Sequence, residues 1–261
     1  MLIRDSIFVW MVRLDAEPIA PELLASCHAV LSAEERARAD RFRREELRRD
    51  YMVCHAALRL VLGDCVGVAP AEVRFADAPS DAAGAKPALF RKIGSGGELA
   101  DVRFNLSHTK GVALIGVALG REIGVDIEWQ RPMDDLEAMA RSVMSDEELA
   151  RWREIDASGR MRAFYHLWTR KESYLKAIGL GLYRSLQDVS VPVSAERLEA
   201  GVNGGEGNRV RDRSGRGVWS VADLTVPEGY SASVCCEGEQ VLPVVFADLD
   251  LNRLIQDSER E

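Results

Sequence analysis

The sequence lacks any apolar run long enough to cross a lipid bilayer. The apolar stretch near its start, Ile7–Val12, is far shorter than the about 20 residues that a transmembrane helix needs, and charged residues flank it. No signal-peptide pattern accompanies it. These absences argue against a membrane partner and lead us to expect a cytoplasmic protein.

A disulfide framework is missing as well. The five cysteines are an odd number, and none of them forms a C-x-x-C pair. A chain of 261 residues buries enough surface to hold its core without a disulfide or a structural metal. We therefore expect reduced thiols in a reducing compartment.

Positive charge is scarce. The net charge is −8, and lysine occurs only five times, so arginine carries most of the positive charge. A general nucleic-acid-binding protein is usually basic, and this balance argues against such a partner. The hydrophobic content of 47% and the charged content of 29% are those of a globular protein.

Hydrophobic periodicity predicts an α+β protein. Strands are expected at Ile7–Leu14, Val112–Ala118, Ile123–Trp129 and Val189–Val193, and a hairpin at Gly217–Leu224 with Tyr230–Cys236. Helices are expected at Ala20–Leu31, Glu46–Leu62, Asp134–Ala150 and Met161–Ile178, and loops at 78–98 and 200–216. Ser32 and Glu35 have the spacing of a capping box. The two halves repeat this outline, which suggests a duplicated unit.

Two carboxylates lie two residues apart in the expected strand Ile123–Trp129. Because side chains alternate along a strand, Asp126 and Glu128 share one face. Like charges this close repel each other, and a hard divalent cation with oxygen ligands would compensate them. The alternative is the solvated face of an edge strand, which the pair taken alone favours.

A third carboxylate lies on the expected helix Met161–Ile178. Glu172 and Lys176 are four residues apart and are neighbours on one helix face. The alternative is a surface ion pair worth only about 0.3–0.5 kcal/mol. The surrounding apolar residues are, however, those of a core helix. A third carboxylate and an ammonium beside the pair of metal-binding carboxylates suit a pyrophosphate ligand. The lysine would neutralise the charge that develops on the phosphate oxygens.

The dipeptide Ser107-His108 lies in a strand-like segment. Successive strand residues point to opposite faces, so the two are not a nucleophile and its base. They are candidates for hydrogen bonds to a phosphate; the alternative is a packed or exposed histidine at a strand end. Upstream, a helix is rich in arginine, and most of this run fits a solvated helix face, with one or two side chains within reach of a phosphate. The run comprises Arg36, Arg38, Arg41, Arg43, Arg44, Arg48 and Arg49.

Three motifs in this order resemble the 4′-phosphopantetheinyl transferase superfamily, and best its longer, two-halved, surfactin-synthetase-activating type. They are F-N-x-S-H at Phe104–His108, G-[IV]-D-x-E at Gly124–Glu128 and W-[ST]-x-K-E-[SA]-x-x-K at Trp168–Lys176. The resemblance covers roughly residues 30–236. It implies two similar α+β halves related by a pseudo-twofold, here residues 1–125 and 126–261, with coenzyme A bound between them.

The resemblance also implies roles for individual residues. Asp126, Glu128 and Glu172 match the ligands of Mg²⁺, for which Mn²⁺ can substitute, and Lys176 matches the lysine at the pyrophosphate of coenzyme A. The matches to contacts at the nucleotide end are Arg38, Arg48, Lys86, Pro87, Ser107 and His108. The segment Ala85-Lys86-Pro87 lacks the glycine of the family's G-K-P, and the arginine matches are loose.

The activity implied is transfer of phosphopantetheine from coenzyme A to a serine of an apo acyl, peptidyl or aryl carrier protein. Glu172 would take the serine proton, directly or through a water, and Lys176 would neutralise the leaving phosphate. The alternatives are another magnesium-dependent phosphoryl-transfer enzyme or hydrolase, and a non-catalytic coenzyme A-binding protein. A monomer is expected, because one chain supplies both walls of the cleft. The helix Asp134–Ala150 is the expected carrier surface; the alternative is that its apolar stripe packs on the core.

Overall fold

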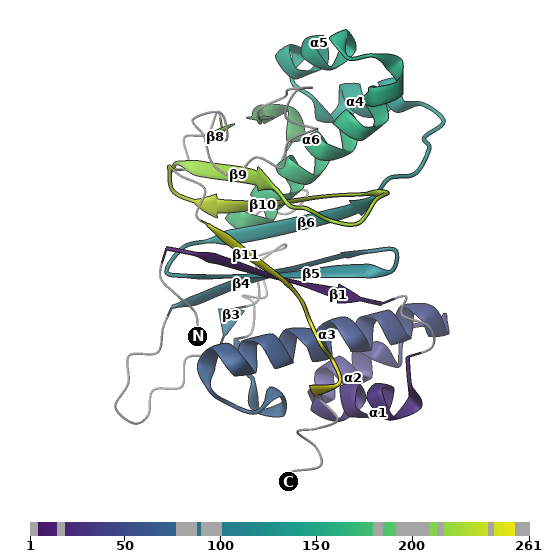
Figure 1. Ribbon diagram of the computed structural model, residues 1–261, viewed down its shortest axis with the longest axis vertical. Coiled ribbons are helices and arrows are strands. Elements are labelled where there is room, and N and C mark those ends of the chain that lie inside the picture. The colour runs from purple at the N-terminus through teal and green to yellow at the C-terminus, as the bar shows by residue number, and fades with distance from the viewer. Residues whose placement is uncertain are drawn as a thin grey trace.

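The computed structural model describes residues 5–14, 19–76, 88–89, 101–179, 185–191, 209–212, 217–239 and 243–253. Within these residues, two sheets lie against each other in the middle of the molecule, and helices cover the outer face of each (Figure 1). The elements, in chain order, are β1 (Ile7–Arg13), α1 (Pro21–Val30), α2 (Ala33–Ala39), α3 (Glu45–Val66), the 3₁₀ turn η1 (Pro70–Glu72), β2 (Phe75–Ala76), β3 (Ala88–Leu89), β4 (Val102–Thr109), β5 (Val112–Leu119), β6 (Ile123–Trp129), α4 (Leu136–Val143), α5 (Asp146–Glu154), α6 (Ala157–Ile178), the 3₁₀ turn η3 (Leu186–Asp188), β7 (Val189–Ser190), β8 (Arg209–Asp212), β9 (Trp219–Asp223), β10 (Tyr230–Glu237) and β11 (Val244–Asp248).

The first sheet has the strand order β11-β1-β5-β4, and helices α1 to α3 pack on its outer face. Helix α2 begins with the expected capping box, in which the Ser32 side chain accepts from the Glu35 amide and the Glu35 carboxylate accepts from the Ser32 amide. The expected α+β class is confirmed, and so are the long helix α3 and strands β1 and β5.

The second sheet has the order β6-β10-β9-β8-β7, and α6 lies across it under α4 and α5 (Figure 1). The expected hairpin is present as the antiparallel pair β9 and β10. Helix α6 ends where Gly179 adopts φ 69°, a left-handed conformation that glycine adopts readily.

Four details of the expected elements are wrong. The helix expected over Asp134–Ala150 is two helices, because Ser145 begins α5 with a capping box to Glu148. The loop expected at 200–216 contains strand β8, which pairs with β9. The loop expected at 78–98 contains strand β3, which pairs with β2, and the rest of it lies outside the described residues. The strand expected at Val189–Val193 ends at Ser190 as β7.

The expected carrier stripe on this segment mostly packs inside. Ala140, Val143 and Met144 are buried in the core that α4 shares with α6, whereas Met139 stays 38% exposed. The alternative, that the stripe packs on the core, therefore holds except at the exposed Met139.

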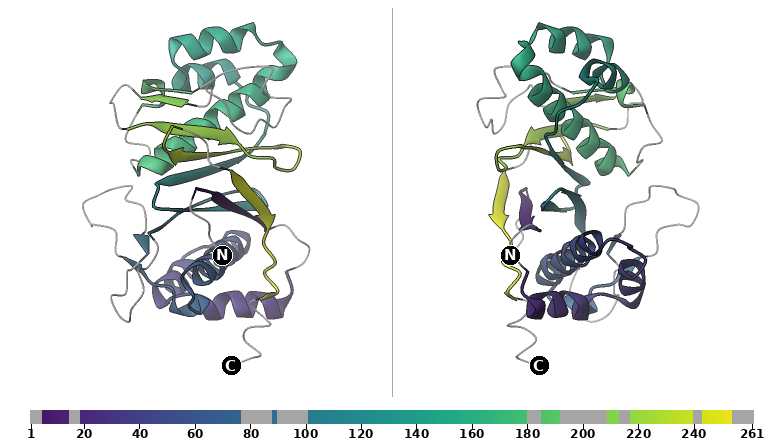
Figure 2. Two further views of the ribbon diagram at one scale, coloured as in Figure 1. Left: turned by 60° about the vertical axis from the view of Figure 1, so that its left-hand side comes forward. Right: turned by 90° about the vertical axis from the view of Figure 1, so that its right-hand side faces the viewer.

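A separate apolar core fills the space between the two sheets, with side chains from β1, β5, β6, β9 and β10. Strand β11 comes after the second sheet in sequence but pairs in parallel with β1 of the first (Figure 2). The expected division at residue 125 falls inside β6; it stays a prediction, as does the pseudo-twofold. None of the helices in the described part of the chain has the length and apolarity that crossing a bilayer demands.

Candidate active site

Helix α6 lies directly on strand β6 because position 124 is glycine. A Cβ atom at Gly124 would be 2.0 Å from the carbonyl oxygen of Ser173 and 2.5 Å from the amide nitrogen of Ala177. These are backbone atoms of the helix turn that carries Glu172 and Lys176. The glycine of the second motif thus permits the close approach that brings the third motif against Asp126.

Asp126, Ser107 and Lys176 form a hydrogen-bonded cluster that joins three elements. The Lys176 ammonium donates to Asp126 Oδ1 at 2.6 Å and to Ser107 Oγ at 2.8 Å. Ser107 Oγ lies 3.0 Å from the same Oδ1. Asp126 is only 3% exposed, and its other oxygen, Oδ2, has no hydrogen-bond partner in the described part of the chain. Oδ1 of this buried carboxylate is therefore held by two hydrogen bonds, and Oδ2 is left without a described partner.

The two other carboxylates feel the charge of Asp126. Burial, and then the neighbouring Asp126 and Glu128, raise the pKa of Glu172 to about 7, against the opposing effect of Lys176. Burial and Asp126 also raise the pKa of Glu128, while Lys176 and a hydrogen bond with Trp168 act to lower it. Glu172 Oε1 is buried and unpartnered among the described residues. The site thus concentrates more negative charge than its single lysine compensates.

Side chains of β4 cap the free edge of β6 and hold the two sheets in register. The amides of Val125, Ile127 and Trp129 point away from β10. They donate in turn to Asn105 Oδ1 at 2.9 Å, Ser107 Oγ at 3.4 Å and Thr109 Oγ1 at 3.3 Å. Sequence reasoning missed this seam, although polar residues at 105, 107 and 109 repeat with the period of a strand.

His108 faces the opposite side from Ser107, as the strand alternation predicts, and is exposed. Partial burial, and then the charge of Lys176, hold its pKa below the usual value, with Asp50 opposing and His55 assisting. Its neighbourhood is therefore the α3 side of the site.

The other residues expected at the nucleotide end of coenzyme A either lack a described contact with the carboxylate cluster or lie outside the described residues. Arg38 lies over the ring of Tyr51 at 5.6 Å, and Arg48 pairs with Asp40 at 3.1 Å. Neither has a described contact with the carboxylate cluster. Lys86 and Pro87 lie outside the described residues.

Lys171, next to Glu172, serves a different purpose. It is fully buried, and its ammonium donates to Glu148 Oε2 at 2.6 Å, to the Val143 carbonyl at 2.8 Å and to the Leu186 carbonyl at 2.9 Å. Burial lowers the pKa of Lys171, and Glu148 opposes this. The pair ties α4 and α5 to α6 and so fixes the helix that carries Glu172. Sequence reasoning missed it because the partners are distant in the chain.

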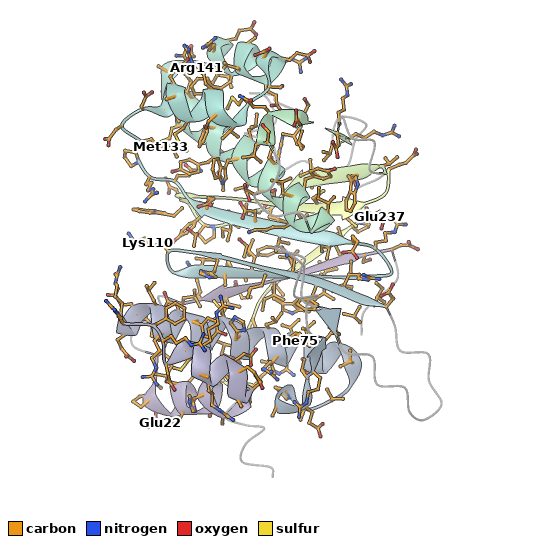
Figure 3. The ribbon with its side chains drawn as sticks, turned by 180° about the vertical axis from the view of Figure 1, so that it is seen from behind. Glu22, Phe75, Lys110, Met133, Arg141 and Glu237 are labelled. Atoms are coloured by element: carbon orange, nitrogen blue, oxygen red, sulfur yellow. The ribbon has the colours of Figure 1, made fainter. Side chains whose placement is uncertain are left out.

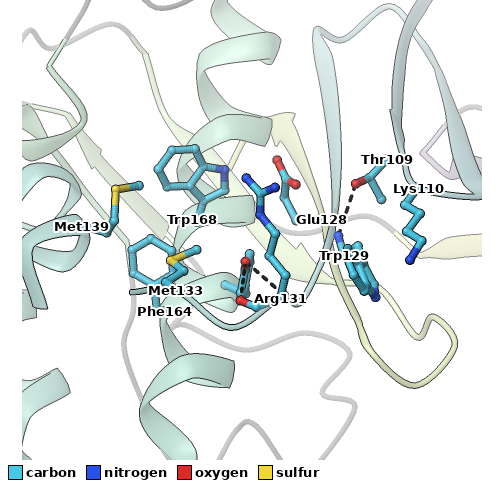
Figure 4. Close-up of a pocket in the computed structure, with 10 residues that line it drawn as sticks. Thr109, Lys110, Glu128, Trp129, Arg131, Met133, Met139, Phe164 and Trp168 are labelled. Atoms are coloured by element: carbon cyan, nitrogen blue, oxygen red, sulfur yellow. Dashed lines mark hydrogen bonds between the residues drawn. The ribbon is translucent and has the colours of Figure 1, made fainter. Parts of the chain in front are cut away.

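A pocket of about 470 Å³ opens beside the cluster and includes Glu128 in its wall (Figure 4). Its apolar wall includes Met133, Phe164 and Trp168, and Lys110 at its rim lies 3.8 Å from the centre of the Trp129 ring. Lys110 and Met133 mark this side of the molecule in Figure 3.

Oxygen ligands are available here for a hard cation. In this arrangement, the described residues contain no group of three His, Cys, Asp or Glu side chains spaced to hold a metal ion. Yet Asp126 Oδ2 and Glu172 Oε1 are buried carboxylate oxygens without partners, and a buried polar atom without a partner is costly. An all-oxygen, acidic donor set of this kind fits Mg²⁺ or Mn²⁺.

Comparison with known proteins finds similarity to 4′-phosphopantetheinyl transferases. Residues 122–235 match the family model described as the 4′-phosphopantetheinyl transferase superfamily. The 4′-phosphopantetheinyl transferase HetI of Nostoc sp. is 34% identical over 240 residues, which are 91% of this chain and 90% of HetI. The 4′-phosphopantetheinyl transferase Sfp of Bacillus subtilis is 29% identical over 174 residues, 67% of this chain and 71% of Sfp. A solved holo-[acyl-carrier-protein] synthase of Thermotoga maritima is 16% identical with a TM-score of 0.35, covering 45% of this chain and 63% of its own, a likeness too slight to bear on the fold.

Proposed function

Because this transferase belongs to the 4′-phosphopantetheinyl transferase superfamily, we propose that it moves the 4′-phosphopantetheine group of coenzyme A onto a serine of an apo carrier protein. The observation that carries the proposal is the meeting of Asp126, Glu128, Glu172 and Lys176 at one place, where helix α6 lies on strand β6. Three acids with one lysine suit the handling of a pyrophosphate rather than of a neutral substrate.

Asp126, Glu128 and Glu172 would hold Mg²⁺, or Mn²⁺ in its place. The unpartnered oxygens of Asp126 and Glu172 and the raised pKa values of Glu172 and Glu128 support this, since both indicate carboxylates short of positive charge. A bound cation of this type polarises phosphoryl oxygens as a Lewis acid.

Side chains of the protein would handle the proton and the charge of the phosphoryl transfer. The serine oxygen of the carrier forms a bond to the β-phosphorus of coenzyme A, and the bond from that phosphorus to the bridging oxygen breaks. The products are holo-carrier and adenosine 3′,5′-bisphosphate. Glu172, a carboxylate with a buried oxygen that lacks a partner among the described residues, would accept the serine proton, directly or through a water. Lys176, whose ammonium lies 2.6 Å from Asp126 Oδ1, would neutralise charge on the leaving phosphate.

The nucleotide end of coenzyme A would lie on the α3 side of the cluster. There, His108, Arg38 and Arg48 are the proposed contacts; Lys86 and Pro87, which lie outside the described residues, are proposed from the motif alone. Support comes from His108, which is exposed and faces away from the carboxylates. Arg48 would exchange its exposed partner Asp40 for a phosphate, at little cost because exposed pairs contribute little.

We expect a monomer that acts in the cytoplasm. The sheets that flank the cluster come from one chain, so a second copy is not required to build the site. The cysteines of the described residues are free thiols, as in a reducing compartment. The carriers are acyl, peptidyl or aryl carrier domains.

Carrier dependence of nucleotide release tests the proposal against a hydrolase. The protein is incubated with coenzyme A and Mg²⁺, with and without a panel of apo-carriers, and adenosine 3′,5′-bisphosphate is measured by liquid chromatography. We expect release only with a carrier whose serine is intact. Equal release without a carrier would identify a hydrolase instead.

A further inference from the structure

The hydroxyl of Ser107 is fully used by the protein itself. A serine hydroxyl has one hydrogen to donate and two lone pairs to accept. Ser107 Oγ accepts from the Lys176 ammonium at 2.8 Å and from the Ile127 amide at 3.4 Å, and its hydrogen is left for Asp126 Oδ1 at 3.0 Å. At 5% exposure the side chain has no room to turn elsewhere. While these three bonds persist, nothing remains for a ligand phosphate.

These bonds decide which oxygen of Asp126 is free. Ser107 and Lys176 both bind Oδ1, and Oδ2 is the buried oxygen without a described partner. A carboxylate anchored through one oxygen cannot rotate about its last bond without losing both contacts. The anchored geometry thus fixes Oδ2 as the oxygen that Asp126 can offer to a cation.

Lys176 is held by the same hydroxyl. Its side chain is 29% exposed, so the ammonium would sample many rotamers without a second contact. Ser107 therefore sets the position of a carboxylate on β6 and of a lysine on α6 from a third element, β4.

We propose that Ser107 is a positioning residue for the metal site, orienting Asp126 and Lys176 rather than contacting coenzyme A. This inference rests on the proposed function for the identity of the site. It predicts that loss of the hydroxyl weakens metal binding and turnover while leaving the affinity for coenzyme A intact.

The seam on β4 supplies a matched control. Asn105 caps the Val125 amide as Ser107 caps that of Ile127, but Asn105 has no described contact with Asp126 or Lys176. Asn105→Ala thus removes a seam bond alone, whereas Ser107→Ala removes a seam bond and the positioning contacts. Ser107→Cys keeps the volume with a weak donor and acceptor, and serves where the alanine variant does not fold.

The test is a pair of titrations that need no carrier and no turnover. Mn²⁺ binding is measured by electron paramagnetic resonance in the presence of coenzyme A, and coenzyme A binding is measured by calorimetry without metal. For Ser107→Ala we expect the affinity for Mn²⁺ to fall by about 10- to 100-fold, as is typical when a residue that orients a metal ligand is lost. The affinity for coenzyme A should stay at the wild-type value, and Asn105→Ala should bind Mn²⁺ normally.

Three results would overturn the inference: unchanged Mn²⁺ affinity in folded Ser107→Ala and Ser107→Cys, a loss confined to coenzyme A, or an equal Mn²⁺ loss in Asn105→Ala. The last would mean that the seam acts as a whole. Kinetics add a second readout, in which kcat falls and KM for coenzyme A does not. If the wild-type protein modifies no carrier, the proposed function fails. The Mn²⁺ and coenzyme A titrations still test the role of Ser107, because they need no carrier.

Discussion

Replacing Gly124 by alanine tests the contact that brings together the two segments of the proposed active site. The added Cβ would meet the Ser173 carbonyl oxygen at 2.0 Å and the Ala177 amide nitrogen at 2.5 Å. Strand β6 cannot retreat easily, because Gly124 pairs with Cys235 of β10 on one side and the seam from β4 holds the other. The helix must therefore move away.

The size of the effect follows from these distances. To restore ordinary contacts near 3.5 Å, α6 must shift by about 1 Å or more. Overpacking of this kind typically costs about 1–3 kcal/mol of unfolding free energy. A displacement of about 1 Å at a catalytic group can cost on the order of 100-fold in rate, so turnover should fall more than stability alone explains.

Urea denaturation and carrier modification rates at saturating coenzyme A measure the two effects. Gly159→Ala is the control on the same helix, because its Cβ would meet only the side-chain carbon Cγ2 of Ile155, at 3.2 Å. Alanine there should be neutral or stabilise the helix by up to about 1 kcal/mol. If Gly124→Ala were as stable and as active as the wild type, α6 could not lie on β6 in the way described.

Three further predictions concern the charges around α6. Lys171→Met should lower the unfolding free energy in urea by about 3–5 kcal/mol, because the Glu148 carboxylate stays buried without its partner; a loss below about 1 kcal/mol would contradict this account of the pair. Asp126→Ala should stay folded by circular dichroism yet lose about 100-fold or more of its turnover at every Mg²⁺ concentration, and normal turnover would remove Asp126 from the site. Asp223 is a pH probe: burial alone would raise its pKa, but the nearby His166 and the hydrogen bonds from Arg170 lower it to about 2. Relative to an unfolded value of about 3.9, this contributes roughly 2–3 kcal/mol that is present above about pH 4 and is lost as the pH falls toward 2. Asp223→Asn should flatten that part of the stability profile, and parallel profiles for the two proteins would refute it.

The sequence predicted best what depends on neighbours along the chain. The periodicity of β6 and α6 and the capping box of Ser32 with Glu35 are local patterns, and each was found in the structure. The break between α4 and α5 was predictable in principle, since Ser145 and Glu148 have the same spacing as the first capping box.

Long-range pairing accounts for what the sequence did not predict. Strand β8 lies in a Gly- and charge-rich segment and exists because β9 offers it a partner. Strand β11 pairs with β1 across nearly the whole chain, which no local pattern signals. At the site, the motifs identified the carboxylates and Lys176, but only the three-dimensional arrangement revealed that Ser107 joins Asp126 to Lys176.

The mass of the carrier after reaction tests the central claim most directly. Apo acyl, peptidyl and aryl carriers are incubated with the protein, coenzyme A and Mg²⁺, and intact masses are recorded before and after, with a chelator and a serine-to-alanine carrier as controls. The account predicts that at least one carrier gains the mass of a single phosphopantetheine group, and that neither control gains it. Unchanged masses across the panel, with a folded protein that binds coenzyme A, would contradict the account.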